Sequence, residues 1–171
     1  GQFIAVYTND QSKLLPRPIS ICEADKENGR LRIVYRIAGA GTLEFSQYGA
    51  GDKLDIMGPL GNGFTLQNKK AFLIGGGIGI PPMLELAKNL DCEKIAVLGY
   101  RDSETFLADE IGKFAEVVIA SDDGSVGTKG NVIDAIKANG AEADVIYACG
   151  PTPMLRALKA YAEENNMECY I

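Results

Sequence analysis

The chain has 171 residues, of which 46% are hydrophobic and 23% charged, the composition of a folded protein with a buried core. Its net charge is −6, and no run of lysine or arginine offers a surface for nucleic acid or anionic lipid. No apolar stretch approaches the roughly 20 residues that cross a bilayer. There is no histidine, which excludes Ser-His hydrolases and histidine-based metal sites. We therefore expect a cytoplasmic protein with neither nucleic acid nor membrane as a partner.

The first part of the chain, as far as about Gly63, has the pattern of short strands separated by turns. The expected strands cover residues 3–7, 19–24, 31–38 and 54–57. Turn residues cluster at 28–29, 39–41, 49–52 and 58–63. Helical periodicity is absent and the turns are regularly spaced, which is typical of a small antiparallel barrel. We predict that this part is entirely β-structure.

From about Ala71 onward, apolar strands alternate with helical segments. The expected strands cover residues 71–74, 95–100, 115–120, 145–149 and 167–171. The expected helices cover residues 82–89, 105–112, 132–138 and 153–165, the last with Thr152 as its N-cap. This alternation predicts a doubly wound parallel sheet with helices on both faces. Two domains follow, residues 1–67 and residues 68–171.

A glycine-rich turn follows the first strand of the second domain. The sequence FLIGGGIGIPPM, residues 72–83, is a buried strand, a turn with Gly75, Gly76, Gly77 and Gly79, and a helix opened by proline. Such a turn lets the backbone approach a pyrophosphate at the start of the helix. Its spacing differs from the usual G-x-G-x-x-G, so a tight turn without a ligand is the alternative.

A second turn of the same kind occurs at ACGPTPM, residues 148–154, where Cys149 and Gly150 lie between a strand and a proline-opened helix. Parallel strands bring their carboxyl ends to one edge of a sheet, so we expect both turns to face one crevice. The alternative for Cys149 is a small buried core residue.

The tetrapeptide Arg17-Pro18-Ile19-Ser20 stands at the start of a strand in the first domain. A flavin dinucleotide needs a cation for its pyrophosphate, an apolar wall for its ring and a hydrogen-bond partner near its reactive nitrogen. These residue types could supply all three. A solvated arginine beside a turn is the alternative for Arg17.

Eight segments together resemble the ferredoxin-NADP reductase superfamily, and within it the electron-transfer subunits of NAD-linked dihydroorotate dehydrogenases. In chain order they are RPIS (17–20), VYR (34–36), GT (41–42), GDKLDIMGPLGNGF (51–64), GGGIGIPPM (75–83), GYRDSETF (99–106), SDDGSVGTKG (121–130) and YACGPTPM (147–154). They cover nearly the whole chain in the family's order. The resemblance implies a flavin-binding barrel followed by a nucleotide-binding α/β domain.

The resemblance also implies two sets of cofactor contacts. Those for FAD are Arg17, Pro18, Ile19, Ser20, Val34, Tyr35, Arg36, Gly41 and Thr42. Those for NAD are Gly75, Gly76, Gly77, Gly79, Asp122, Cys149 and Gly150. Ser20 and Cys149 would flank the hydride that passes between the cofactors. No catalytic proton-transfer residue is expected, because the cofactors carry the chemistry.

Two departures from the family affect these expectations. The family's barrel has a further strand before Gly1, so we expect an incomplete barrel. The family subunit continues past Ile171 into a segment whose cysteines bind a 2Fe-2S cluster, so we expect that cluster only in a longer chain. The cysteines present, Cys22, Cys92, Cys149 and Cys169, are too widely spaced to form a close metal-binding pair.

The resemblance implies a role in pyrimidine biosynthesis. Electrons from dihydroorotate would pass through FMN in a catalytic partner subunit and the 2Fe-2S cluster to FAD and then NAD+, in a heterotetramer. An NAD(P)H-ferredoxin oxidoreductase subunit and a hydrogenase-associated diaphorase subunit are alternatives, although those branches usually vary at RPIS. An alternative of another class is a non-catalytic nucleotide-binding module that senses redox state.

Overall fold

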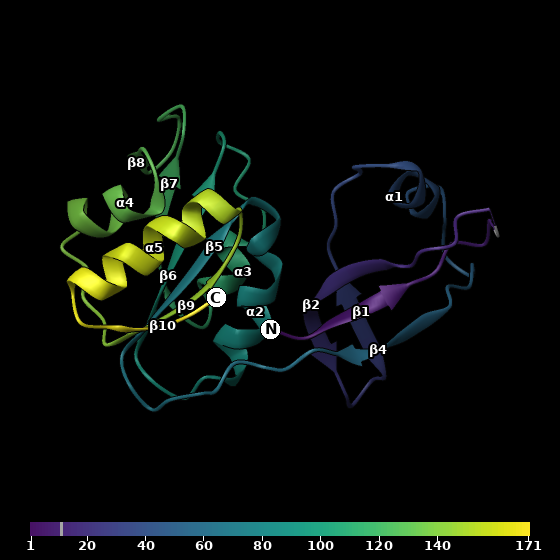
Figure 1. The fold of residues 1–171 in the computed structure, drawn as a ribbon, viewed down its shortest axis with the longest axis horizontal. Coiled ribbons are helices and arrows are strands. Elements are labelled where there is room, and N and C mark those ends of the chain that lie inside the picture. Colours follow the sequence, from purple (N-terminus) through teal and green to yellow (C-terminus); the bar gives the residue numbers. More distant parts are fainter. Residues whose placement is uncertain (11) are drawn as a thin grey trace. The chain divides into compact units, whose positions relative to one another are not determined.

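The computed structural model describes residues 1–10 and 12–171, which form two compact units, Gly1–Gly63 and Phe64–Ile171 (Figure 1). The first unit contains β1 (Phe3–Val6), β2 (Arg17–Asp25), β3 (Arg30–Ile33), α1 (Ala40–Phe45) and β4 (Ile56–Leu60). Its strands form a four-stranded antiparallel sheet in the order β3-β2-β1-β4. The predicted antiparallel sheet is confirmed, and it is open between β3 and β4 as far as the described residues show.

The core of the first unit lies between one face of this sheet and α1. Ile4 and Val6 of β1 and Ile19 of β2 pack together with Phe45 of α1. Alternate residues of a strand face the same side, which is why these positions are two apart along β1. Phe45 therefore fixes α1 on the sheet.

The prediction that the first unit is entirely β-structure is wrong at α1. A helix of six residues is too short to show a helical period in its sequence. It is started by a side chain instead, because the Thr42 hydroxyl accepts hydrogen bonds from the amides of Ala38 (2.9 Å) and Gly39 (3.2 Å). The glycine cluster interpreted as a turn is thus the start of a helix.

The strand expected over residues 31–38 ends at Ile33. The prediction that Val34, Tyr35 and Arg36 lie in a strand is therefore wrong. Ile33 pairs with Ile21, and the chain then leaves the sheet toward α1. Tyr35 packs edge-on against Phe45, with ring centroids 6.0 Å apart. Burial of this aromatic ring replaces further strand pairing.

The turn expected over residues 58–63 is also wrong in its first three residues, which belong to β4. Leu60 pairs with Phe3 of β1. A Cβ atom at Gly58 would lie 2.6 Å from Cγ2 of Ile4, so glycine at this position permits close approach of the two strands.

The second unit is an α/β structure. Its elements are β5 (Ala71–Gly76), a 3₁₀ turn (Gly77–Gly79), α2 (Pro81–Asn89), β6 (Lys94–Tyr100), α3 (Ala108–Ile111), β7 (Glu116–Ser121), β8 (Thr128–Lys129), α4 (Val132–Ala138), β9 (Val145–Cys149), α5 (Thr152–Glu164) and β10 (Glu168–Tyr170). The strands form a six-stranded parallel sheet in the order β10-β9-β5-β6-β7-β8. Helices α4 and α5 cover one face and α2 and α3 the other (Figure 1).

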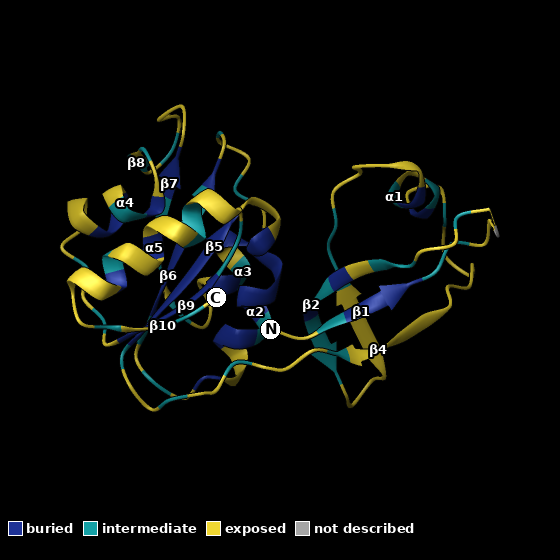
Figure 2. Ribbon diagram, viewed as in Figure 1, coloured by how far each residue is buried: buried dark blue, intermediate teal, exposed yellow. Residues whose placement is uncertain are grey.

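The central strand β5 is buried along its whole length, as Figure 2 shows by its dark blue colour. Phe72 and Ile74 pack toward α4 and α5, in a cluster with Val97, Ile136 and Leu158. A strand covered on both faces has a nearly continuous apolar sequence, which explains why this one was evident from the sequence. The predicted doubly wound parallel sheet is confirmed.

Two helix starts differ from the sequence prediction. Helix α5 begins at Thr152 with Pro151 as its N-cap, so the expectation that Thr152 is the N-cap is wrong. Pro151 has extended backbone angles and therefore holds the boundary position. Helix α3 begins only at Ala108, because Leu107 has a left-handed φ of 65° that interrupts the segment expected from residue 105.

Strand β8 was not expected at all, since two residues are too few to show the alternation of apolar and polar residues that indicates a strand.

In the part of the chain that the structure describes, no helix is long and apolar enough to span a membrane.

Candidate nucleotide and flavin sites

The two glycine turns meet at the point where the strand order of the sheet reverses. Strand β5 lies between β6, its successor along the chain, and β9, which follows much later. Open parallel sheets bind ligands outside the carboxyl ends of their strands at such a reversal. In the register of β5 and β9, Gly75 pairs with Cys149. The carboxyl ends of both strands therefore lie side by side.

The backbones of the two turns are in direct contact. A Cβ atom at Gly79 would lie 2.1 Å from the carbonyl oxygen of Cys149 and 2.6 Å from the amide nitrogen of Gly150. A Cβ atom at Gly150 would lie 3.2 Å from the amide nitrogen of Gly76. Glycine at these positions is thus required by the close approach of one turn to the other.

The same packing extends to the helices that follow the turns. A Cβ atom at Gly75 would lie 2.8 Å from the Cα atom of Ile80, at the start of α2. A Cβ atom at Gly76 would lie 2.6 Å from the sulfur of Met154 in α5. These two glycines let strand and helix pack closely, which is one of the roles that glycines have in dinucleotide-binding turns.

Gly77 differs from its neighbours because it is exposed and open. Its φ is 51°, and a Cβ atom there would meet nothing within 4 Å. The next residue, Ile78, is 47% exposed, and α2 begins three residues later at Pro81. An exposed backbone just before a helix of nine residues suits a phosphate group, which amide N–H groups and the helix dipole favour.

Cys149 is half-buried, and this burial raises the pKa of its thiol above the usual value of 9.0. The thiol is therefore protonated at neutral pH and is a poor nucleophile. A neutral, small side chain beside the turn is compatible with a neighbouring ligand ring. We therefore assign Cys149 no role in covalent catalysis.

Asp122 is exposed at the carboxyl end of β7, on the same edge of the sheet as the two turns. The preceding Ser121 is fully buried, and its hydroxyl donates to the carbonyl of Val126 (2.6 Å) and shapes the loop. The carboxylate of Asp123 accepts from the amide of Ser125 (2.9 Å), and a hydrogen bond with the Ser125 side chain, followed by this amide bond, lowers the pKa of Asp123. Two carboxylates thus follow β7, and that of Asp123 is hydrogen-bonded within the loop.

In the first unit, Arg17 lies over Gly41. A Cβ atom at Gly41 would be 2.5 Å from Nε of Arg17, so the guanidinium packs against the bare backbone of α1. The guanidinium also donates to the carbonyl of Leu15. Two residues that the sequence places in separate motifs, 24 positions apart, are therefore in contact, and the contact fixes a half-buried cation beside α1.

The other residues of the RPIS motif have different surroundings. Ile19 is 7% exposed and belongs to the core, whereas Pro18 is exposed and Ser20 half-buried. Strand alternation puts Ser20 on the opposite side of β2 from Arg17 and Ile19. Within this unit, then, Arg17 and Gly41 come together but Ser20 does not join them.

The second set of expected flavin contacts surrounds the start of α1. Val34 and Tyr35 are half-buried and Arg36 is exposed. The Thr42 hydroxyl is occupied at the helix start, where it also donates to the carbonyl of Gly39 (3.1 Å). Thr42 therefore shapes the backbone here.

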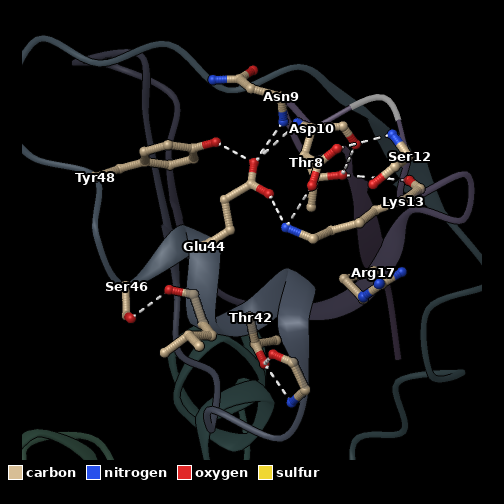
Figure 3. Close-up of polar contacts among 12 residues, drawn as sticks. Thr8, Asn9, Asp10, Ser12, Lys13, Arg17, Thr42, Glu44, Ser46 and Tyr48 are labelled. Atoms are coloured by element: carbon tan, nitrogen blue, oxygen red, sulfur yellow. Dashed lines mark hydrogen bonds and ion pairs between the residues drawn. The ribbon is translucent and has the colours of Figure 1, made fainter.

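A polar cluster that the sequence analysis missed holds α1 to the segment after β1 (Figure 3). The Glu44 carboxylate accepts from the backbone amide of Asn9 (2.7 Å), forms an ion pair with Lys13 (2.6 Å) and accepts from the Tyr48 hydroxyl. The ion pair and hydrogen bond with Lys13, followed by the bond from Tyr48, lower the pKa of Glu44 to about 2. Because Glu44 and Lys13 are 31 residues apart, no local pattern could have indicated this cluster.

All four cysteines are free thiols in the described structure. In residues 1–10 and 12–171, no group of three or more Cys, Asp or Glu side chains could hold a metal ion.

The fold and the paired turns define a protein of the ferredoxin-NADP reductase class. The structure superposes with a TM-score of 0.71 on a ferredoxin NADP+ reductase from Neisseria gonorrhoeae with bound FAD and NADP, at 15% identity over 95% of this chain and 78% of that one. It superposes with a TM-score of 0.87 on an NADH-dependent reduced ferredoxin-NADP oxidoreductase, at 30% identity over 99% of this chain and 63% of that one. No protein-family model matches the chain.

Curated relatives identify the family more closely. The dihydroorotate dehydrogenase B (NAD(+)) electron transfer subunit of Streptococcus mutans is 48% identical over 96% of this chain and 67% of its own length. That of Geobacillus kaustophilus is 46% identical over 92% of this chain and 65% of its own length. The chain belongs to the family of dihydroorotate dehydrogenase B electron transfer subunits, and it spans about two thirds of the length of these relatives.

Proposed function

We propose that the chain binds FAD in its first unit and NAD in its second and transfers electrons between them. The observation that carries this proposal is the contact between the turns of Gly79 and Cys149 at the reversal of the strand order. A nucleotide-binding protein needs a bare backbone at this edge of the sheet. The fold relationship to a reductase with bound FAD and NADP supports the same proposal.

The residues present fit the two cofactors. Arg17, half-buried beside Gly41, would pair with the FAD pyrophosphate, and Ser20 would lie near the flavin ring. The exposed backbone at Gly77 would receive the NAD pyrophosphate, and Asp122 would accept a ribose hydroxyl. When bound, FAD accepts a hydride and releases its electrons singly. The chain's own task is to position the two groups, and no side chain has to move a proton.

Family membership supports a physiological role for the longer protein. We propose that it receives electrons from dihydroorotate, through FMN in a catalytic partner subunit and a 2Fe-2S cluster, and delivers them to NAD+. The heterotetramer, the cytoplasmic location and the absence of a metal site in this chain remain predictions from the sequence. The relatives' name, which includes both dihydroorotate dehydrogenase and NAD(+), is the support for this role.

An absorption spectrum of the full-length protein, with and without NADH, tests the proposal. We expect a flavin spectrum that NADH bleaches. A protein that binds NADH but carries no flavin would instead be a non-catalytic nucleotide-binding module, and the proposal would be wrong.

A second candidate is a diaphorase that serves another partner, such as ferredoxin. The 30% identity to the NADH-dependent reduced ferredoxin-NADP oxidoreductase favours it. The two roles are distinguished by mixing the full-length protein with its FMN-containing subunit and measuring reduction of NAD+ by dihydroorotate. Activity with ferredoxin alone would support the diaphorase role.

A further inference from the structure

An exposed aromatic ring follows β6 at the same edge of the sheet as the two glycine turns. Strand β6 ends at Tyr100, and its carboxyl end lies beside that of β5, where Gly99 pairs with Gly76. In the segment that follows, the ring of Phe106 is 41% exposed. A single exposed aromatic residue is common on protein surfaces, so its support and its neighbours have to indicate a role.

Tyr100 holds Phe106 in place through two contacts. The Tyr100 hydroxyl donates to the carbonyl of Phe106 (2.9 Å). The two rings meet edge to face, with centroids 5.6 Å apart and planes at 86°. Tyr100 is itself buried, so it is a rigid support. The exposed ring of Phe106 is therefore fixed to the end of β6.

The backbone directly after Phe106 is strained. Leu107 has a φ of 65°, in the left-handed region that is unfavourable for a residue with a large side chain. The Leu107 side chain is buried, whereas the ring of Phe106 remains outside. Strained backbone that the surrounding packing maintains is concentrated at ligand-binding sites. The strain thus supports a functional reason for the exposed ring.

Tyr100 also links Phe106 to Asp122. The backbone carbonyl of Tyr100 accepts a hydrogen bond from the amide of Asp122 (3.2 Å), because β6 and β7 end side by side. Asp122 is the proposed partner of a ribose hydroxyl of NAD. One buried tyrosine thus contacts both the residue assigned to the ribose and the exposed ring. The base attached to that ribose would therefore lie on the side of the site where Phe106 stands.

We propose that Phe106 is a binding residue of the nucleotide site and that its ring stacks on the adenine of NAD. Every base has a planar face that stacks on an aromatic side chain without any hydrogen-bond partner. The assignment rests on the proposed NAD site and adds the residue that binds its adenine. Tyr100 is a positioning residue, because it acts through Phe106.

A tryptophan reporter tests the stacking directly. The sequence has no tryptophan, so Phe106→Trp introduces a single indole into the chain. ADP-ribose, which keeps the adenosine and both phosphates of NAD but lacks nicotinamide, should quench the indole fluorescence. Phe114→Trp is the matched control, because Phe114 is equally exposed (41%) but precedes β7, at the opposite edge of the sheet. Binding of ADP-ribose to Phe106→Trp, detected by calorimetry, without a change in fluorescence would overturn the proposal.

Removal of the ring measures its contribution to affinity. Phe106→Ala should weaken ADP-ribose binding about fivefold to a hundredfold, the range found for stacking of a base on an aromatic residue. It should also raise the KM for NADH and leave kcat unchanged, because the stacking is the same in the ground state and the transition state. Phe106→Tyr, which keeps a ring, should bind ADP-ribose as the wild type does.

Reduced nicotinamide mononucleotide, which has no adenosine, separates stacking from damage to the fold. Its rate of reducing an artificial acceptor should be equal in Phe106→Ala and the wild type, whereas a distorted site would slow it. Normal ADP-ribose binding by Phe106→Ala would remove Phe106 from the site and leave the site itself intact. If the wild-type chain binds neither ADP-ribose nor NADH, the proposed nucleotide site is wrong, and the assignment of Phe106 is wrong with it.

Discussion

Gly79 approaches the main chain of Cys149 so closely that a Cβ atom at Gly79 would lie 2.1 Å from the Cys149 carbonyl oxygen. The atom in the way is backbone, which cannot rotate aside as a side chain could. Any larger residue must therefore separate the two turns that form the edge of the proposed nucleotide site.

Gly79→Ala should lower the free energy of unfolding of the second unit by about 1–3 kcal/mol or more, because overpacking forces the backbone to shift. It should also weaken NADH binding, since the two turns move apart. Gly140→Asn, outside both turns of the same unit, is the control, because position 140 is open and asparagine tolerates its left-handed φ of 59°. Urea unfolding and NADH titration check both effects. Equal behaviour of the two variants would contradict a packed junction.

Arg17→Ala should weaken FAD binding roughly tenfold to a hundredfold, because a charge-assisted bond to phosphate is worth about 1.5–3 kcal/mol. Gly41→Ala should have a smaller effect in the same direction, since the added Cβ would displace the Arg17 guanidinium without removing its positive charge. Arg30→Ala, at the exposed start of β3, controls for loss of one positive charge. FAD occupancy after purification and titration of the apoprotein measure the changes. Normal occupancy in Arg17→Ala would remove this residue from the flavin site.

The α/β unit was more predictable than the β unit for a physical reason. Strand β9 and helix α4 occupy the residues expected from the sequence, because buried parallel strands and amphipathic helices carry strong apolar patterns. The first unit is a small open sheet whose strands have much exposed surface. Strand β4 is exposed over most of its length, so its pattern gave little indication of where it begins and ends.

The candidate functional residues also differ in how far the sequence predicted them. The glycine turns were recognisable because a strand, a bare backbone and a proline-opened helix are adjacent in sequence. The contact of Arg17 with Gly41, the Glu44 cluster and the hydrogen bond from Tyr147 to Thr65 join residues far apart in the chain. A single sequence carries no local pattern that indicates such contacts, because they depend on tertiary packing.

Asp122→Asn should raise the kcat/KM for NADPH relative to NADH by about tenfold, because it removes a charge that would repel a 2′-phosphate a few ångströms away. The wild-type protein should prefer NADH. Asp123→Asn is the comparison, since the Asp123 carboxylate bonds the Ser125 amide and should affect the loop more than the preference. An artificial electron acceptor makes the assay independent of partner proteins. Equal kcat/KM values for NADH and NADPH in the wild type would contradict the proposed role of Asp122.

The stability of the first unit should fall in acid because of Glu44. Its ordinary pKa is 4.5, and the ion pair and hydrogen bond with Lys13 lower the pKa of Glu44 in the folded chain to about 2. A lowered folded-state pKa means that the unfolded chain binds the proton more readily. The stabilisation by the Glu44 cluster is therefore complete above about pH 4.5 and is lost as the pH falls toward 2.

Glu44→Gln tests this pH dependence. At neutral pH the variant should unfold at lower urea concentration than the wild type, because glutamine cannot form the ion pair with Lys13. The difference should shrink between pH 4.5 and 2, because the Glu44 carboxylate of the unfolded wild type takes up its proton over this range and that of the folded chain only near pH 2. Glu27→Gln, in the exposed hairpin between β2 and β3, controls for removal of one negative charge. A gap between wild type and Glu44→Gln that stays constant across this range would mean that Glu44 stabilises α1 by packing alone, and that its charge does not hold Asn9 and Lys13.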